Sequence, residues 1–101
     1  MPRYFAKERS AELYEAIARL SDAEECRRFF DDLCSISELH AIEQRFEVAK
    51  LLNAGQVYTD IMDKTHASSA TISRVNRVLN YGSGTLSDVI NRLSSADAQK
   101  A

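Results

Sequence analysis

The sequence predicts an all-α protein, and its use of Pro, Gly and apolar residues supports this fold class. The only Pro is Pro2 and the three Gly lie at or after position 55, so helices can continue uninterrupted through the first half of the chain. Hydrophobic residues make up 45% and charged residues 28% of the chain, a balance typical of folded globular proteins rather than disordered ones. A chain of 101 residues is expected to form a single domain.

The first half of the chain, residues 1–54, predicts three helices. The first covers roughly residues 4–20, where apolar residues recur at helical spacing. Ser21 and Glu24 have the spacing of a capping box, which predicts that a second helix begins there. A third and longest helix is expected to begin at Ser35 or Ser37 and to end before Gly55. These helices present more apolar surface than one short chain covers, which predicts that residues 1–54 form a dimerisation core.

The second half predicts a helix-turn-helix over residues 57–81. A short helix, with Val57 and Ile61 on its inner side, is followed by small residues and then by a recognition helix over residues 68–80. Apolar residues at helical spacing form the expected inner side of that second helix, namely Ile72, Val75 and Leu79. A last helix is expected over residues 84–94, followed by a frayed tail over residues 95–101.

The outer side of the predicted recognition helix has the chemistry of a DNA contact. The net charge is −2, yet the segment from Thr65 to Ser87 contains two Arg and no Asp or Glu. Small and hydroxyl side chains at a helix N-terminus allow close approach to the major groove, and Arg bonds guanine or phosphate. An alternative interpretation is that the serines only cap the helix and the arginines are solvated surface. The residues predicted to contact DNA are Ser68, Ser69, Ala70, Thr71, Ser73, Arg74 and Arg77.

A resemblance to a known family favours the DNA-binding interpretation. Residues 51–84, LLNAGQVYTDIMDKTHASSATISRVNRVLNYGSG, closely resemble the DNA-binding half of the Trp-repressor-like family, in particular its YerC/YecD-type branch. The resemblance implies six helices per chain, an intertwined homodimer, and a bacterial transcriptional regulator, expected to be a repressor, that reads a palindromic operator in double-stranded DNA. In this family the turn position of His66 is usually Gly, so we expect some backbone strain at His66 if its φ is positive.

The resemblance also implies the position of an effector pocket. In the Trp repressor proper, tryptophan is held by two arginines and a threonine, and the matching positions here are Arg45, Arg74 and Thr71. Val75 replaces a Gly of that family and is expected to fill space that the indole ring needs. We therefore predict that tryptophan is not bound and that any effector is a different small molecule.

Other kinds of site find little support in the sequence. His40, His66, Cys26 and Cys34 lack the short spacing of a zinc motif, and no catalytic or phosphate-binding motif is present, so we expect no metal, no cofactor and no enzymatic activity. No apolar run is long enough for a membrane span, and the N-terminus lacks the apolar core of a signal peptide, which predicts a cytoplasmic protein.

Two alternative functions and one unassigned aromatic residue remain after this interpretation. The chain is also compatible with a small all-α enzyme that gathers Arg, Lys and Glu inside an intertwined dimer. It is equally compatible with an interaction module that keeps the helix-turn-helix without contacting DNA. Tyr81 follows the predicted recognition helix, where it either covers the core or contacts the sugar-phosphate backbone.

Overall fold

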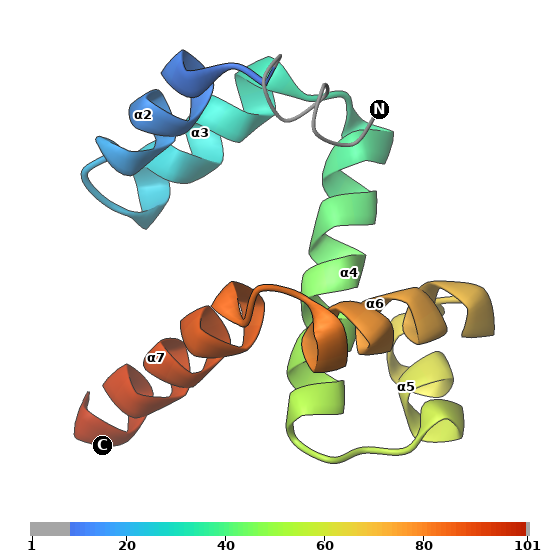
Figure 1. The fold of residues 1–101 in the computed structure, drawn as a ribbon. Helices are drawn as coiled ribbons and strands as arrows, with labels where there is room; N and C mark the ends of the chain where they lie inside the picture. Colours follow the sequence, from blue (N-terminus) through green and yellow to red (C-terminus); the bar gives the residue numbers. More distant parts are fainter. Residues whose placement is uncertain (1–8, 101) are drawn as a thin grey trace. The chain divides into compact units, whose positions relative to one another are not determined.

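The protein is helical throughout the part of the chain that the structure describes (Figure 1). The computed structural model describes the backbone of residues 9–100 and the side chains of residues 9–95. Within residues 9–100 there are six α-helices and no strand, which confirms the predicted fold class and helix number. The helices are α2 (Ala11–Ala18), α3 (Ala23–Leu33), α4 (Ile36–Asn53), α5 (Tyr58–Thr65), α6 (Ser69–Tyr81) and α7 (Thr85–Lys100).

The chain divides into two compact units, residues 1–39 and residues 40–101. In the first unit, α2 begins at Ala11, because the hydroxyl of Ser10 caps it by accepting a hydrogen bond from the backbone N–H of Leu13 at 3.2 Å. Within the described residues, α2 is therefore shorter at both ends than the helix that the sequence predicted over residues 4–20. Residues 4–8 of that prediction lie outside the described residues.

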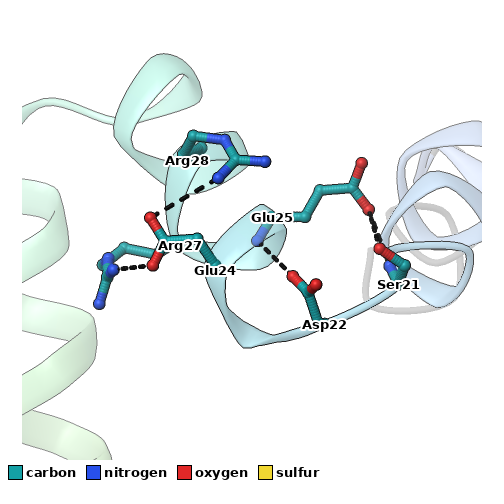
Figure 2. Close-up of polar contacts among 6 residues, drawn as sticks. All are labelled: Ser21, Asp22, Glu24, Glu25, Arg27 and Arg28. Carbon is teal, nitrogen blue, oxygen red and sulfur yellow. Dashed lines mark hydrogen bonds and ion pairs between the residues drawn. The ribbon is translucent and has the colours of Figure 1, made fainter.

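The start of α3 is capped one residue later than the sequence predicted (Figure 2). Asp22, rather than Ser21, is the N-cap, and its carboxylate accepts a hydrogen bond from the backbone N–H of Glu25 at 2.8 Å. The Glu25 carboxylate in turn accepts from the backbone N–H of Ser21 at 2.7 Å and from its hydroxyl at 3.0 Å. These bonds stabilise the charged carboxylate and lower the pKa of Glu25. Glu24, the predicted capping partner, forms ion pairs with Arg27 and Arg28 instead.

A reciprocal capping box does form at the start of α4, and it selects Ser35 over Ser37 as the cap. The Ser35 hydroxyl accepts from the backbone N–H of Glu38 at 3.2 Å, and the Glu38 carboxylate accepts from the backbone N–H of Ser35 at 2.8 Å. The second of these bonds lowers the pKa of Glu38, because it favours the ionised form. At the other end, α4 stops at Asn53 as predicted, and Gly55 follows with a φ of 87° that favours glycine.

The core of the second unit is formed by α4, α5, α6 and α7. Its buried residues are Val48, Ala49, Ile61, Ala67, Ile72, Val75 and Ile90. In α4, Val48 is fully buried, whereas Ile42, nearer the start of the helix, is 46% exposed. The reason is that several helices pack around the second half of α4, so its buried face shifts along its length.

A side-chain hydrogen bond joins the last residue of α4 to the middle of α7. The Asn53 amide donates to the side-chain oxygen of Asn91 at 2.9 Å. The helix α7 continues to Lys100, beyond the expected end at residue 94. None of the helices in the described part of the chain has the length and apolar character needed to cross a membrane.

Candidate nucleic-acid interface

The helices α5 and α6 pack against each other and are joined by a three-residue turn, as the helix-turn-helix prediction required (Figure 1). His66 ends α5 in the left-handed conformation, with φ 61° and ψ 16°, and its backbone N–H donates to the carbonyl of Met62 at 2.9 Å. The φ of His66 is therefore positive, which is the condition under which the sequence predicted backbone strain. A non-glycine residue in this conformation costs about 1 kcal/mol, so the surrounding bonds must hold the turn.

Thr65 supplies three of the bonds that hold this turn. Its hydroxyl donates to the carbonyl of Ile61 at 2.7 Å and accepts from the backbone N–H of Ala67 at 3.1 Å. Its carbonyl accepts from the side-chain amide of Gln44 on α4 at 3.1 Å. The turn is therefore bonded both to the helix before it and to α4, which fixes where α6 begins.

The inner sides of the two helices agree with the sequence prediction except at Val57. Ile61 and Ile72 are fully buried, Val75 is 6% exposed, and Leu79 packs against them, as predicted. Val57 is 59% exposed, so its predicted inner position is wrong. It is the N-cap of α5 and has extended backbone, so it lies outside the helical periodicity from which the prediction was made. The half-buried Tyr58 packs against the core in its place.

The predicted DNA-contacting residues lie together at the start and along the outer side of α6. Ser68 is the N-cap: its hydroxyl accepts from the backbone N–H of Thr71 at 3.1 Å and lies 3.1 Å from the Thr71 hydroxyl, to which it donates. Thr71 is half-buried, while the other predicted residues are exposed: Ser68, Ser69, Ala70, Ser73, Arg74 and Arg77. Four of them line a shallow hollow on α6, together with Val78: Ala70, Ser73, Arg74 and Arg77.

The electrostatics of this surface favour an anion. In residues 9–95 the ion pairs join Arg27 and Arg28 to Glu24, and Lys50 to Glu47, so the guanidinium groups of Arg74 and Arg77 stay available to a ligand. No acidic residue lies in the first turn of α6. The N-terminal end of the α6 dipole and the two arginines therefore both attract a negatively charged ligand to this surface.

Replacing the α6 cap tests how this helix is held. We expect Ser68→Ala to lower the free energy of unfolding by about 1 kcal/mol, because the backbone N–H of Thr71 loses its acceptor. Urea unfolding followed by circular dichroism measures this change. Ser69→Ala is the matched control, since Ser69 is an equally exposed serine one position along, inside the helix rather than at its cap. Equal loss in both variants would contradict the capping role of Ser68.

A cavity lies between α4 and α6 and collects the three residues of the predicted effector pocket. Arg45, Thr71 and Arg74 all line it, and its volume is about 370 Å³. The remaining lining is apolar: Ile42, Phe46, Val75, Val78 and Leu86. Val75 lines this cavity although it is only 6% exposed and belongs to the buried core. The lining therefore combines two arginines with apolar side chains.

The sequence left the position of Tyr81 open and did not place Val78 among the predicted DNA-contacting residues. Both lie in α6, which begins at Ser69 and ends at Tyr81, one residue later at each end than predicted. Val78 is 46% exposed and Tyr81 is 85% exposed, so Tyr81 does not cover the core. Gly82 is the C-cap of this helix, and a Cβ added to it would lie 2.5 Å from the Val78 carbonyl oxygen. Gly82 could have been read from the sequence as a helix end, which would have included Tyr81 in the helix.

The two cysteines of the chain lie outside this surface. Cys26 and Cys34 are free thiols and half-buried, and Cys34 has extended backbone just after α3. In the part of the chain that the structure describes, no group of three or more His, Cys, Asp or Glu side chains is placed to hold a metal ion.

The fold and this surface together define an all-helical protein of the helix-turn-helix class. The sequence profile described as Trp repressor protein matches residues 8–94. The chain therefore belongs to the Trp repressor family, as the resemblance predicted.

Relatives and solved structures agree with this membership. The uncharacterised protein YerC of Bacillus subtilis (strain 168) is 44% identical over 90 residues, which are 89% of this chain and 86% of YerC. The structure of a TrpR-like protein from Eubacterium eligens ATCC 27750 has a TM-score of 0.78 at 51% identity, covering 82% of this chain and 86% of that one. The structure of a protein from Staphylococcus aureus, provisionally assigned as a Trp repressor, has a TM-score of 0.82 at 41% identity, covering 88% and 92%.

Proposed function

We propose that this protein is a transcriptional regulator, acting as a repressor, that binds double-stranded DNA in a sequence-specific manner through α6. The observation that carries this proposal is the outer side of α6, where Arg74 and Arg77 are exposed beside small side chains and without a neighbouring carboxylate. Major-groove readers approach DNA with the N-terminal part of such a helix. Small side chains there allow close approach to base edges, while the arginines bond guanine or phosphate.

We propose further that the protein acts as a homodimer. Large apolar residues are exposed in both compact units, among them Leu33 and Ile36 in the first and Ile42 and Leu93 in the second. Surfaces of this kind are typical of protein interfaces. A dimer would present two recognition helices to the two half-sites of a palindrome, about 34 Å apart. The dimer rests on this exposure and on the family resemblance. Sedimentation should therefore show twice the mass of the chain at micromolar concentration.

The experiment that tests the proposal is a mobility-shift assay with genomic fragments at several stated salt concentrations. We expect some fragments to bind much more tightly than others, and all binding to weaken as salt rises, since contacts to phosphates release counterions. Equal affinity for every duplex, or affinity that does not change with salt, would contradict the proposal.

The cavity between α4 and α6 is proposed as the site of an effector other than tryptophan. Its arginines suit a carboxylate, and its lining includes Val75 and Val78, whose branched side chains we expect to occupy space that an indole needs. Titration calorimetry of the full chain with tryptophan is therefore expected to give no saturable heat at millimolar ligand. Saturable binding at micromolar tryptophan would show that this reading of Val75 is wrong.

The two alternative functions are less well supported. A catalytic bundle would need Arg74 or Arg77 enclosed with a carboxylate, and both side chains are exposed. An interaction module without DNA contact would give no reason for a cationic helix surface free of acids. We therefore propose a regulatory rather than a catalytic role.

A further inference from the structure

The outer side of α6 continues one turn beyond the predicted DNA contacts, to Tyr81. At about 100° per residue, Ala70, Arg74, Arg77 and Tyr81 fall within about 60° of one another around the helix axis. The buried residues Ile72 and Val75, with Leu79, lie nearly opposite. Tyr81 thus belongs to the same stripe as the arginines, and it is the most exposed of the large hydrophobic side chains in the described part of the chain, at 85%.

The side chains along this stripe become longer toward the C-terminal end of α6. Ala70 and Ser73, near the start, are small, whereas Arg74, Arg77 and Tyr81 each reach several ångströms further from the axis. From Ala70 to Tyr81 the helix advances about 16 Å at 1.5 Å per residue. A helix with this profile fits a groove with its N-terminus close to the bases and its C-terminus further out, where long side chains bridge the larger gap.

We propose that Tyr81 is a DNA-backbone contact, with its phenol hydroxyl donating a hydrogen bond to a phosphate at the edge of the major groove. This inference rests on the proposed function of α6. Tyr hydroxyls are among the groups that bond phosphates in protein–DNA complexes, and such bonds set the position of the protein without reading sequence. Tyr81 would then set how far the C-terminal end of α6 stands from the groove.

A second copy of the chain is a poorer occupant of this stripe than DNA. A symmetric contact through the stripe would bring Arg74 and Arg77 toward the same arginines of the other copy. No carboxylate lies between Thr65 and Ser87 to compensate them. Charge complementarity therefore favours a polyanion over a protein copy on this side of α6.

Two substitutions of Tyr81 test the contact in the full-length chain. The probes are a duplex selected by the wild type and an unrelated duplex of the same length. We expect Tyr81→Phe, which removes only the hydroxyl, to weaken binding to both duplexes by roughly tenfold for each helix engaged. Tyr81→Ala is expected to weaken binding at least as much. The salt dependence should not change in either variant, because a neutral donor releases no counterion.

Tyr14→Phe is the matched control, since it also removes one hydroxyl from an exposed tyrosine, in α2 and outside the candidate interface. It should bind within twofold of the wild type. A methylphosphonate placed at the contacted phosphate should weaken wild-type binding as Tyr81→Phe does, and the two changes should not add.

Several results would overturn the inference while leaving the proposed function intact. These are wild-type affinity in Tyr81→Phe, a loss confined to the selected duplex, and a change of oligomeric state in sedimentation with unchanged DNA affinity. Absence of salt-sensitive binding by the wild type would instead remove the proposed function itself, and this inference with it.

Discussion

Replacing Arg74 and Arg77 together by Ala is expected to weaken binding to duplex DNA by about two orders of magnitude or more. Both guanidinium groups are exposed on the outer side of α6, and no carboxylate of that helix's first turn competes for them. Each arginine that meets a phosphate also contributes about 0.9 to the slope of log affinity against log salt. Titrations at four or more salt concentrations therefore measure both the loss of affinity and the smaller slope.

The control for this double variant is Arg92→Ala. Arg92 is an exposed arginine of α7, so its removal changes the net charge without touching α6. We expect its affinity to stay within about threefold of the wild type, as for a distant charge screened by salt. If Arg92→Ala lost as much affinity as the α6 variant, binding would depend on overall charge rather than on this helix. Unchanged DNA affinity in the double variant would mean that these arginines of α6 do not contact DNA, which would favour the alternative in which the helix-turn-helix serves another interaction.

Ile61→Ala is expected to cause the largest loss of stability, about 3 kcal/mol in the free energy of unfolding. Ile61 is fully buried where α5 meets α4 and α6, so truncation leaves a cavity that the packed neighbours cannot fill. A loss of this size is a large share of the 5–15 kcal/mol typical of a small domain. Urea denaturation measures it, with circular dichroism and an unchanged m-value as the criterion for a two-state comparison.

Val57→Ala, at the N-cap of the same short helix, provides the control. Val57 is β-branched like Ile61 and was predicted on the same inner side, but it is 59% exposed. Its truncation should change the free energy of unfolding by less than about 0.5 kcal/mol. A comparable loss in both variants would mean that Val57 is covered in the folded protein in solution.

The elements most clearly encoded in the sequence were those in which local preference and packing agree. The turn at residues 66–68 follows from small residues between two apolar patterns, and Ile72, Val75 and Leu79 are spaced so that only one face of α6 can be buried. The residues on the other faces of α6 must then be exposed, and they include most of the predicted DNA contacts. The spacing of the apolar residues alone therefore predicts that Arg74 and Arg77 lie on the outer side of α6.

The errors arose where a residue sits at the boundary of a helix. Val57 fits the apolar pattern of α5 but precedes its first helical residue, so the pattern gives the wrong side. Asp22 and Ser21 are both good caps, and only the hydrogen bonds of Glu25 show which one is used. The cavity beside Arg45 depends on the distance between α4 and α6, and the spacing of residues along the sequence does not give that distance.

The hydrogen bond from Gln44 to the Thr65 carbonyl has a consequence for protein engineering. Residues 58–81 could be taken for a module that can be moved into another protein. However, the end of α5 is hydrogen-bonded to a side chain of α4, and Val48 and Ala49 of α4 belong to the same buried core. A chimaera that moves only residues 58–81 into a foreign scaffold would leave the Thr65 carbonyl without its partner and Ile72 uncovered. The smallest transplantable module therefore begins near Gln44, with the second half of α4 included.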